Sequence, residues 1–159
     1  ESWNLVPLTQ YLKKLNVIQL QALLDITIID NPEASQDGRF GVLYSFWCYN
    51  RGLRVFLKTF TTSEVPLQSL TALYPSSGWL EREAWDLFGI KFLNHGDLRR
   101  ILTDYGFRGH PLRKDFPLMG YLEIRYEDSF RSLIFEPVEL SQEFRLFKFE
   151  MPWSLWPAK

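Results

Sequence analysis

The side chains that could do chemistry are concentrated in one stretch of this sequence. Glu81, Glu83 and Asp86 fall within a short run, and Asp104 and Asp115 follow further along the chain. Paired carboxylates can act as general acid and base or bind a metal ion. Glu81 and Glu83 would not face each other on a helix, because helical neighbours are three or four residues apart. We expect the carboxylates to pair with basic residues of the same stretch, namely Arg82, Arg99, Arg100, Arg113 and Lys114.

Histidine and cysteine offer little support for a metal or redox centre. His95 and His110 lie in separate loops, and neither has a histidine or cysteine at ligand spacing. We expect loop histidines that donate hydrogen bonds. Cys48, the single cysteine, lies in an apolar stretch that favours a buried and inert thiol. One cysteine excludes a disulfide within the chain and a cluster ligated by this chain alone, so the sequence predicts no cofactor and no metal.

A nucleic-acid interface has one weak signal. Gly106-Phe-Arg-Gly109 has the G-x-x-G form of a loop that clamps RNA, but such a loop needs a helix on each side and Pro111 follows closely. The net charge of −1 at pH 7 lacks the basic excess of a dedicated nucleic-acid binder. We therefore expect no nucleic-acid partner.

The basic pairs Arg99-Arg100 and Arg113-Lys114 are better explained by protein contacts. Acidic residues flank both pairs, and arginine pairs with carboxylates in a bidentate manner. We predict that at least one of these four residues pairs with an acid of a partner or of the helix around residue 85, where Arg82 and Asp86 are also spaced to pair. The candidate interface residues are Glu81, Arg82, Glu83, Asp86, Arg99, Arg100, Asp104, Tyr105, His110, Arg113, Lys114 and Asp115.

Hydrophobic periodicity predicts the elements that position these residues. Helices are expected at residues 7–15, with Leu8 on the apolar face, at 67–73 and at 79–88, the last ended by Gly89, which tolerates a left-handed conformation. Strands are expected at residues 26–29, 40–49 and 53–61, and none of these runs is long enough to span a bilayer. The pattern predicts an α+β fold in which a small mixed or antiparallel sheet is flanked by helices.

The sequence changes character after residue 90. Glycine and proline interrupt every periodic run, although aromatic residues remain frequent. Strands are expected at 121–126 and 133–136, and one or two helical turns at 140–147. Aromatic content opposes disorder, so we predict a domain at 1–89 and a long extended C-terminal arm at 90–159 that docks on partner subunits.

Three runs resemble a known family. They are Glu81-Arg-Glu-x-x-Asp86-x-Phe-Gly-Ile, Asp97-Leu-Arg-Arg-Ile-Leu-Thr-Asp-Tyr-Gly-Phe and Gly109-His-Pro-Leu-Arg-Lys-Asp-Phe-Pro. They are similar to the thirty-kilodalton subunit of respiratory NADH dehydrogenase (complex I), of the mitochondrial type. The resemblance implies a structural subunit of the peripheral arm, in the quinone module, without cofactor or catalytic residues. It also implies a place on the matrix side of the mitochondrial inner membrane, in a hetero-oligomer beside the forty-nine-kilodalton subunit that carries the quinone site.

The resemblance has one departure, and two other functions remain open. The family domain often begins well before Pro7, with a further helix and strand, so we expect an uncovered sheet edge at the strand of Ile26 or of Phe40. The first alternative is a standalone protein-binding or RNA-binding module that uses the Gly106 loop. The second is a hydrolase that uses the acidic cluster.

Overall fold

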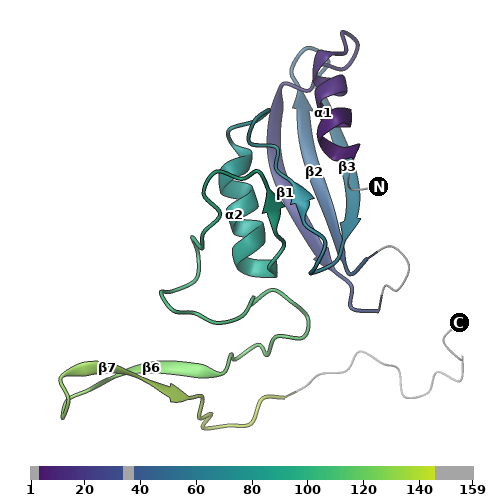
Figure 1. Ribbon diagram of the computed structural model, residues 1–159. Helices are drawn as coiled ribbons and strands as arrows, with labels where there is room; N and C mark the ends of the chain where they lie inside the picture. The colour runs from purple at the N-terminus through teal and green to yellow at the C-terminus, as the bar shows by residue number, and fades with distance from the viewer. Residues whose placement is uncertain (1–3, 34–37, 146–159) are drawn as a thin grey trace, which may run out of the picture. The chain divides into compact units, whose positions relative to one another are not determined.

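The structure, a computed structural model, describes residues 4–33 and 38–145. These residues form two compact units, divided after Leu118 (Figure 1). The predicted boundary was after Gly89. The chain from residue 90 to residue 118 belongs to the first unit, because its side chains and backbone bond to a helix and a strand of that unit.

The first unit is built on an antiparallel sheet of three strands, β1 (Ala22–Asp30), β2 (Phe40–Cys48) and β3 (Leu53–Thr61), in the order β1-β2-β3 (Figure 1). All three strands were predicted, because β-branched and aromatic residues dominate them. The expected edge is corrected in part. The strand of Phe40 pairs on both sides and is central, whereas the strand of Ile26 is an edge.

The hydrophobic core lies between one face of this sheet and the helices α1 (Leu5–Lys14) and α2 (Ser77–Phe88). Phe40, Val42, Tyr44 and Phe46 alternate along β2 and are all fully buried, because alternate residues of a strand point to the same face. Leu5 and Ala84 contribute from the two helices. The α+β class predicted from periodicity is confirmed.

Two local predictions in this unit are wrong. Residues 67–73 form no helix: β4 (Leu67–Gln68) pairs in parallel with β5 (Phe92–Leu93), and a turn follows it. The partner strand lies beyond helix α2 in the chain, so local periodicity could not reveal the pairing. In α1, the buried positions are Leu5 and Thr9 rather than the predicted face containing Leu8, which is half-exposed.

The second unit contains a β-hairpin of β6 (Leu122–Glu127) and β7 (Ser132–Pro137). Both strands were predicted. Residues 140–145 are not helical, which corrects the expected helical turns at that end, and residues 146–147 lie outside the described part. Across residues 4–33 and 38–145, no helix has the length and hydropathy needed to cross a membrane.

Candidate functional site

Helix α2 ends at a glycine that makes room for the following chain. Gly89 adopts a left-handed conformation with φ of 77°, and its N–H donates to Trp85 O at 2.8 Å. A Cβ atom at this position would collide with the guanidinium of Arg113 and would lie 2.6 Å from the ring of His110. The glycine is therefore needed for conformation and for close packing.

The centre of the site is the carboxylate of Asp86, which is fully buried. Oδ2 accepts the backbone N–H groups of Ile101, Leu102 and Thr103 at 3.1, 2.7 and 2.9 Å. Oδ1 accepts the Thr103 hydroxyl at 2.7 Å and the guanidinium of Arg100 at 3.1 Å. One side chain of α2 thereby fixes the path of three consecutive loop residues. The Arg100–Asp86 pair also confirms the prediction that a basic residue of this stretch binds the helix.

The ionisation of Asp86 follows from these contacts. Burial by itself raises the pKa of a carboxyl group, since it disfavours the charged form. The hydrogen bonds from Thr103, Leu102 and Ile101 outweigh burial and lower the pKa of Asp86 to about 2. The site thus holds a stable carboxylate, which is unsuited to act as a general base near neutral pH because such a base needs a pKa close to the working pH.

The predicted pairing of Arg82 with Asp86 is wrong. Arg82 lies over the ring of Trp79 at 5.0 Å and donates from Nε to Arg99 O at 3.2 Å. The carboxylate of Asp86 is buried, so it does not lie on the solvent-facing side of α2 where a pair four residues apart would form. The backbone N–H groups of the loop occupy this carboxylate in place of Arg82, and these donors are already fixed in position.

His110 and Arg113 satisfy the carbonyl groups at the end of α2. His110 Nδ1 donates to Asp86 O at 2.9 Å, and Arg113 Nε donates to Phe88 O at 2.6 Å. Such carbonyls have no partner within the helix. His110 also packs on Trp85, with ring centroids 5.3 Å apart. Burial, and then the nearby arginines, lower the pKa of His110, so it is a neutral loop histidine that donates a hydrogen bond, as predicted.

A second carboxylate, Asp30 at the end of β1, was not predicted to contribute. It accepts two hydrogen bonds from Arg39, at 2.7 and 2.8 Å, and the backbone N–H of Lys114 at 2.7 Å. Arg39 also bonds Asp115 at 2.9 Å. The bond from Arg39 lowers the pKa of Asp30. The sequence signal was only an acid at a strand end, followed by an arginine at the start of the next strand.

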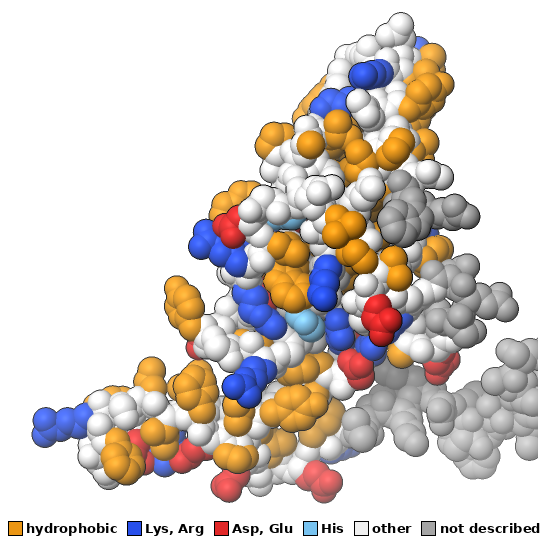
Figure 2. Space-filling model, in the orientation of Figure 1, with side chains coloured by type: hydrophobic (Ala, Val, Ile, Leu, Met, Phe, Trp, Pro, Cys, Tyr) orange, Lys and Arg blue, Asp and Glu red, His pale blue; other side chains and the backbone are white. Residues whose placement is uncertain are grey.

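The remaining interface candidates differ widely in exposure. Glu81 is fully buried on α2 and accepts the N–H of Leu70. Tyr105 is 95% exposed, and Glu83, Arg99 and Asp104 are also exposed, with Arg99 paired to the neighbouring Asp97. Figure 2 shows Lys and Arg side chains interspersed with hydrophobic ones on the face in view.

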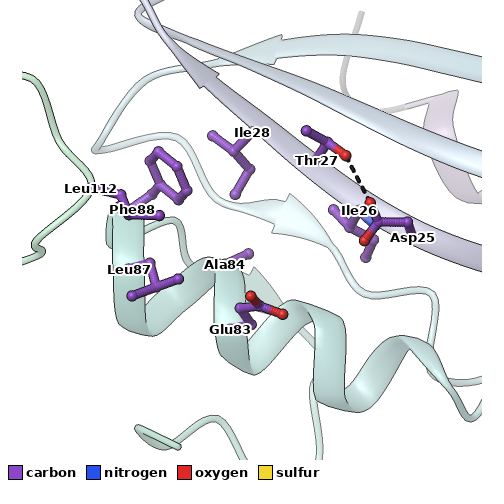
Figure 3. Close-up of a pocket in the computed structure, with 9 residues that line it drawn as sticks. All are labelled: Asp25, Ile26, Thr27, Ile28, Glu83, Ala84, Leu87, Phe88 and Leu112. Carbon is purple, nitrogen blue, oxygen red and sulfur yellow. Dashed lines mark hydrogen bonds between the residues drawn. The ribbon is translucent and has the colours of Figure 1, made fainter. Parts of the chain in front are cut away.

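A pocket of about 230 Å³ lies between β1 and α2 (Figure 3). Ile26 and Ile28 from β1 and Ala84 and Phe88 from α2 make most of its wall apolar. The carboxylate of Asp25 lies beside Ile26, at the end of the pocket away from Phe88, and accepts the Thr27 hydroxyl and the Ile26 N–H. Within the described ranges, no group of three or more His, Cys, Asp or Glu could hold a metal ion.

The Gly106 loop lacks the setting of an RNA clamp. Residues 94–118 contain no helix, whereas a G-x-x-G clamp joins two helices. Gly106 has φ of 75° and Gly109 has φ of 104°, and a Cβ atom on Gly109 would lie 2.8 Å from the ring of Phe116. Gly109 is required for packing within the chain.

Comparisons with known proteins agree with one another. Residues 1–122 match the family described as respiratory-chain NADH dehydrogenase, 30 Kd subunit. NADH-ubiquinone oxidoreductase subunit 9 of Acanthamoeba castellanii is 49% identical over 154 residues, which cover 97% of this chain and 77% of that protein. NADH dehydrogenase (ubiquinone) iron–sulfur protein 3 of Oryza sativa subsp. japonica is 48% identical over 150 residues, covering 94% and 78%.

A solved structure shares the fold. It comes from the membrane-bound sulfane sulfur reductase, an archaeal respiratory membrane complex, and has a TM-score of 0.62 with 23% sequence identity, covering 73% of this chain and 68% of that one. The residues that tie the loop to α2 fall in the part of the chain that the family model matches. This chain belongs to the family of the 30 Kd subunit of respiratory-chain NADH dehydrogenase.

Proposed function

We propose that this chain is a structural, cofactor-free subunit of the peripheral arm of NADH:ubiquinone oxidoreductase, within its quinone module. The observation that carries the proposal is the use of the charged motif. Asp86, Arg100 and Arg113 bond to the backbone or to one another inside the fold, where they shape a loop. Charged residues used in this way hold the loop in its conformation and do not form a catalytic centre.

The hydrolase alternative fits this geometry poorly. Asp86 is inaccessible, and its pKa lies far below the range of a general acid.

Relatives carry the name iron–sulfur protein 3. A cluster is usually held by four cysteines, and this sequence has one.

The β6–β7 hairpin supports docking on a partner. Directly opposed residues of an antiparallel pair point to the same face. One face of the hairpin consists entirely of apolar residues, and the five largest are between 46% and 65% exposed. They are Leu122, Ile124, Tyr126, Leu133 and Phe135. Figure 2 shows hydrophobic side chains along this part of the chain. A two-stranded hairpin is at best marginally stable alone in water, so a partner surface is the natural cover.

We infer that this partner is the quinone-site subunit, on the matrix side of the mitochondrial inner membrane. The relatives named as ubiquinone oxidoreductase subunits support the complex as a whole. Exposed members of the charged stretch, including Tyr105, Arg99, Asp104 and Lys114, would form a second contact region.

The test is a double variant that replaces both residues of the central apolar pair of the hairpin, Ile124→Ser and Phe135→Ser. We expect native gels to show at least a tenfold loss of this chain from the assembled complex, with reduced recovery of the quinone-site subunit in a pull-down. The matched control replaces Glu123→Ser, a residue on the opposite face of the hairpin. The docking proposal is wrong if the double variant assembles like the control. A complex that assembles fully but reduces ubiquinone slowly would instead point to a catalytic role.

A further inference from the structure

Helix α2 carries a second buried carboxyl group, whose surroundings differ from those of Asp86. Glu81 is fully buried, and its carboxyl group meets Leu70 and His95 rather than the loop that Asp86 holds. Oε1 accepts the N–H of Leu70 at 2.8 Å. Oε2 has no hydrogen-bond partner among the described residues. A buried carboxylate oxygen without a donor is costly, and the cost rises if the group is charged.

The nearest basic group does not supply a compensating charge. His95 Nε2 lies 3.9 Å from Glu81 Oε2, and the imidazole is 5% exposed. The N–H of Asp97 donates to His95 Nδ1 at 3.1 Å, so this nitrogen is an acceptor and carries no proton. Nε2 therefore carries the proton and donates to Gly78 O at 3.2 Å. This assignment, made from the hydrogen-bond partners, gives a neutral imidazole.

Two further buried oxygens in the same region lack a hydrogen-bond partner within residues 4–33 and 38–145. Ser77 Oγ lies one helical turn before Glu81 on α2, and Tyr44 Oη reaches from β2. Both residues are fully buried, and both interact with the carboxyl group of Glu81. A hydroxyl oxygen can accept a proton donor as well as donate. Neither hydroxyl donates to Oε2 in this structure, so an ionised Glu81 would lack a donor at this buried oxygen.

From this geometry we propose that Glu81 is a neutral carboxylic acid at neutral pH, so that the chain holds one buried proton between α2, β2 and the segment around His95. The proton resides on Oε2, the carboxyl oxygen that receives no donor. Oε1 keeps the bond from Leu70. The neutral form removes an uncompensated charge from the core.

The balance of environmental effects points the same way. Burial raises the pKa of Glu81, and the hydroxyl of Ser69 and the N–H of Leu70 oppose this rise without cancelling it. The titratable groups that face Glu81 are His95 and Tyr44. Burial raises the pKa of Tyr44, so the phenol remains neutral.

Ionisation of Glu81 has a consequence for stability. A carboxyl group whose pKa is raised in the folded chain contributes stability that is present below its unfolded pKa. That stability is lost as pH rises through the folded pKa. Raising the pH should therefore weaken the packing of α2 on the sheet. Glu81 is therefore a proton-binding site, and loss of its proton loosens the fold.

The experiment is carbon-13 NMR of the full chain labelled at the glutamate side-chain carboxyl. We expect one glutamate resonance to keep the protonated chemical shift at neutral pH, to disappear in Glu81→Gln and to remain in Glu83→Gln, an exposed control on the same helix. A neutral-pH spectrum of the unsubstituted chain without a protonated resonance overturns the proposal. So does a protonated resonance that persists in Glu81→Gln.

If Glu81→Gln fails to fold, Tyr44→Phe identifies the group. Removing the Tyr44 hydroxyl should shift the protonated resonance or its titration midpoint, whereas an unchanged resonance in both this variant and Ser77→Ala overturns the proposal.

Denaturation across pH adds a second measurement. The unsubstituted chain should lose stability relative to Glu81→Gln as the pH rises, and a parallel pH dependence of the two chains contradicts the proposal.

Discussion

The loop of residues 97–118 and the β6–β7 hairpin are both rich in charged and aromatic residues, yet they use them in opposite ways. In the loop, the side chains of Arg100 and Arg113 bond to α2, and the backbone N–H of Lys114 bonds to Asp30 of β1. In the hairpin, Arg125 bonds Glu136 and Glu127 on one face, and the other face presents apolar side chains to solvent. A dense cluster of charge therefore marks internal construction in one region, while apolar side chains mark the docking surface in the other.

Among the substitutions that test this contrast, Asp86→Ala should cause the largest loss of stability. The substitution removes the acceptor of three backbone N–H groups and leaves Arg100 without its carboxylate. Breaking a buried pair by removing one partner costs about 3–5 kcal/mol. We expect that loss in the free energy of unfolding, measured by urea denaturation, with early hydrogen exchange at Leu102 and Thr103.

The control for this prediction is Asp104→Ala, since Asp104 is exposed and its carboxylate accepts the N–H of the adjacent Tyr105. It should cost about 1 kcal/mol or less, as expected for a single exposed hydrogen bond. Equal losses in the two variants would mean that Asp86 does not hold the loop.

Acid should weaken the same contact. The pKa of Asp86 falls from 3.8 to about 2 on folding. A carboxyl group with a lowered pKa contributes stability that is present above its unfolded pKa and is lost as pH falls through the folded value. The contribution is on the order of 2–3 kcal/mol, since one pKa unit corresponds to about 1.4 kcal/mol. Denaturation of the unsubstituted chain and of Asp86→Asn should converge between pH 4 and pH 2, whereas a constant difference between them would contradict the assignment.

Gly89→Ala should have an intermediate effect, and it has a matched control. Gly89 and Gly106 have nearly the same φ, 77° and 75°. The left-handed conformation costs an alanine about 1–2 kcal/mol at either position. Only at Gly89 would the added methyl group also meet Arg113 and His110, because no described residue lies within 4 Å of a Cβ at Gly106. Thermal denaturation should show a larger loss for Gly89→Ala, and equal losses would show that the two side chains move aside freely.

The sequence was sufficient for the elements that local physics determines. Strands β1 to β3 and β6 and β7 follow from β-branched and aromatic residues, and the end of α2 follows from Gly89. The prediction that at least one of four basic residues pairs with a partner or with this helix is met by Arg100, which pairs with Asp86. These features depend on neighbours in sequence or on residue type alone.

The remaining features depend on backbone groups that a sequence does not display. Asp86 is held mainly by N–H groups of residues 101–103, which almost any residue types there would offer. Spacing alone therefore favoured the wrong partner, Arg82. Likewise, β4 pairs with β5 through main-chain bonds, and strands this short are too brief to show a period. The inward direction of Glu81 follows from the placement of α2 on the sheet.

The smallest effect should come from an arginine substitution in the hairpin, compared with the same substitution in the loop. Arg125 bonds Glu136 through two contacts at 2.8 and 2.9 Å, but its side chain is half-exposed. Arg100 bonds a carboxylate that is fully buried. Exposed pairs contribute little because water and salt screen them, whereas a buried carboxylate loses a charge partner that water cannot replace.

We therefore expect Arg125→Ala to leave native-gel abundance of the complex unchanged within error, and Arg100→Ala to lower both the unfolding free energy and the assembled fraction. Raising the ionic strength should erase any remaining effect of Arg125→Ala and should leave that of Arg100→Ala largely intact. If Arg125→Ala reduces assembly as much as Arg100→Ala, the charged face of the hairpin also contacts a partner. The division between a charged framework in the loop and an apolar docking face in the hairpin would then be wrong.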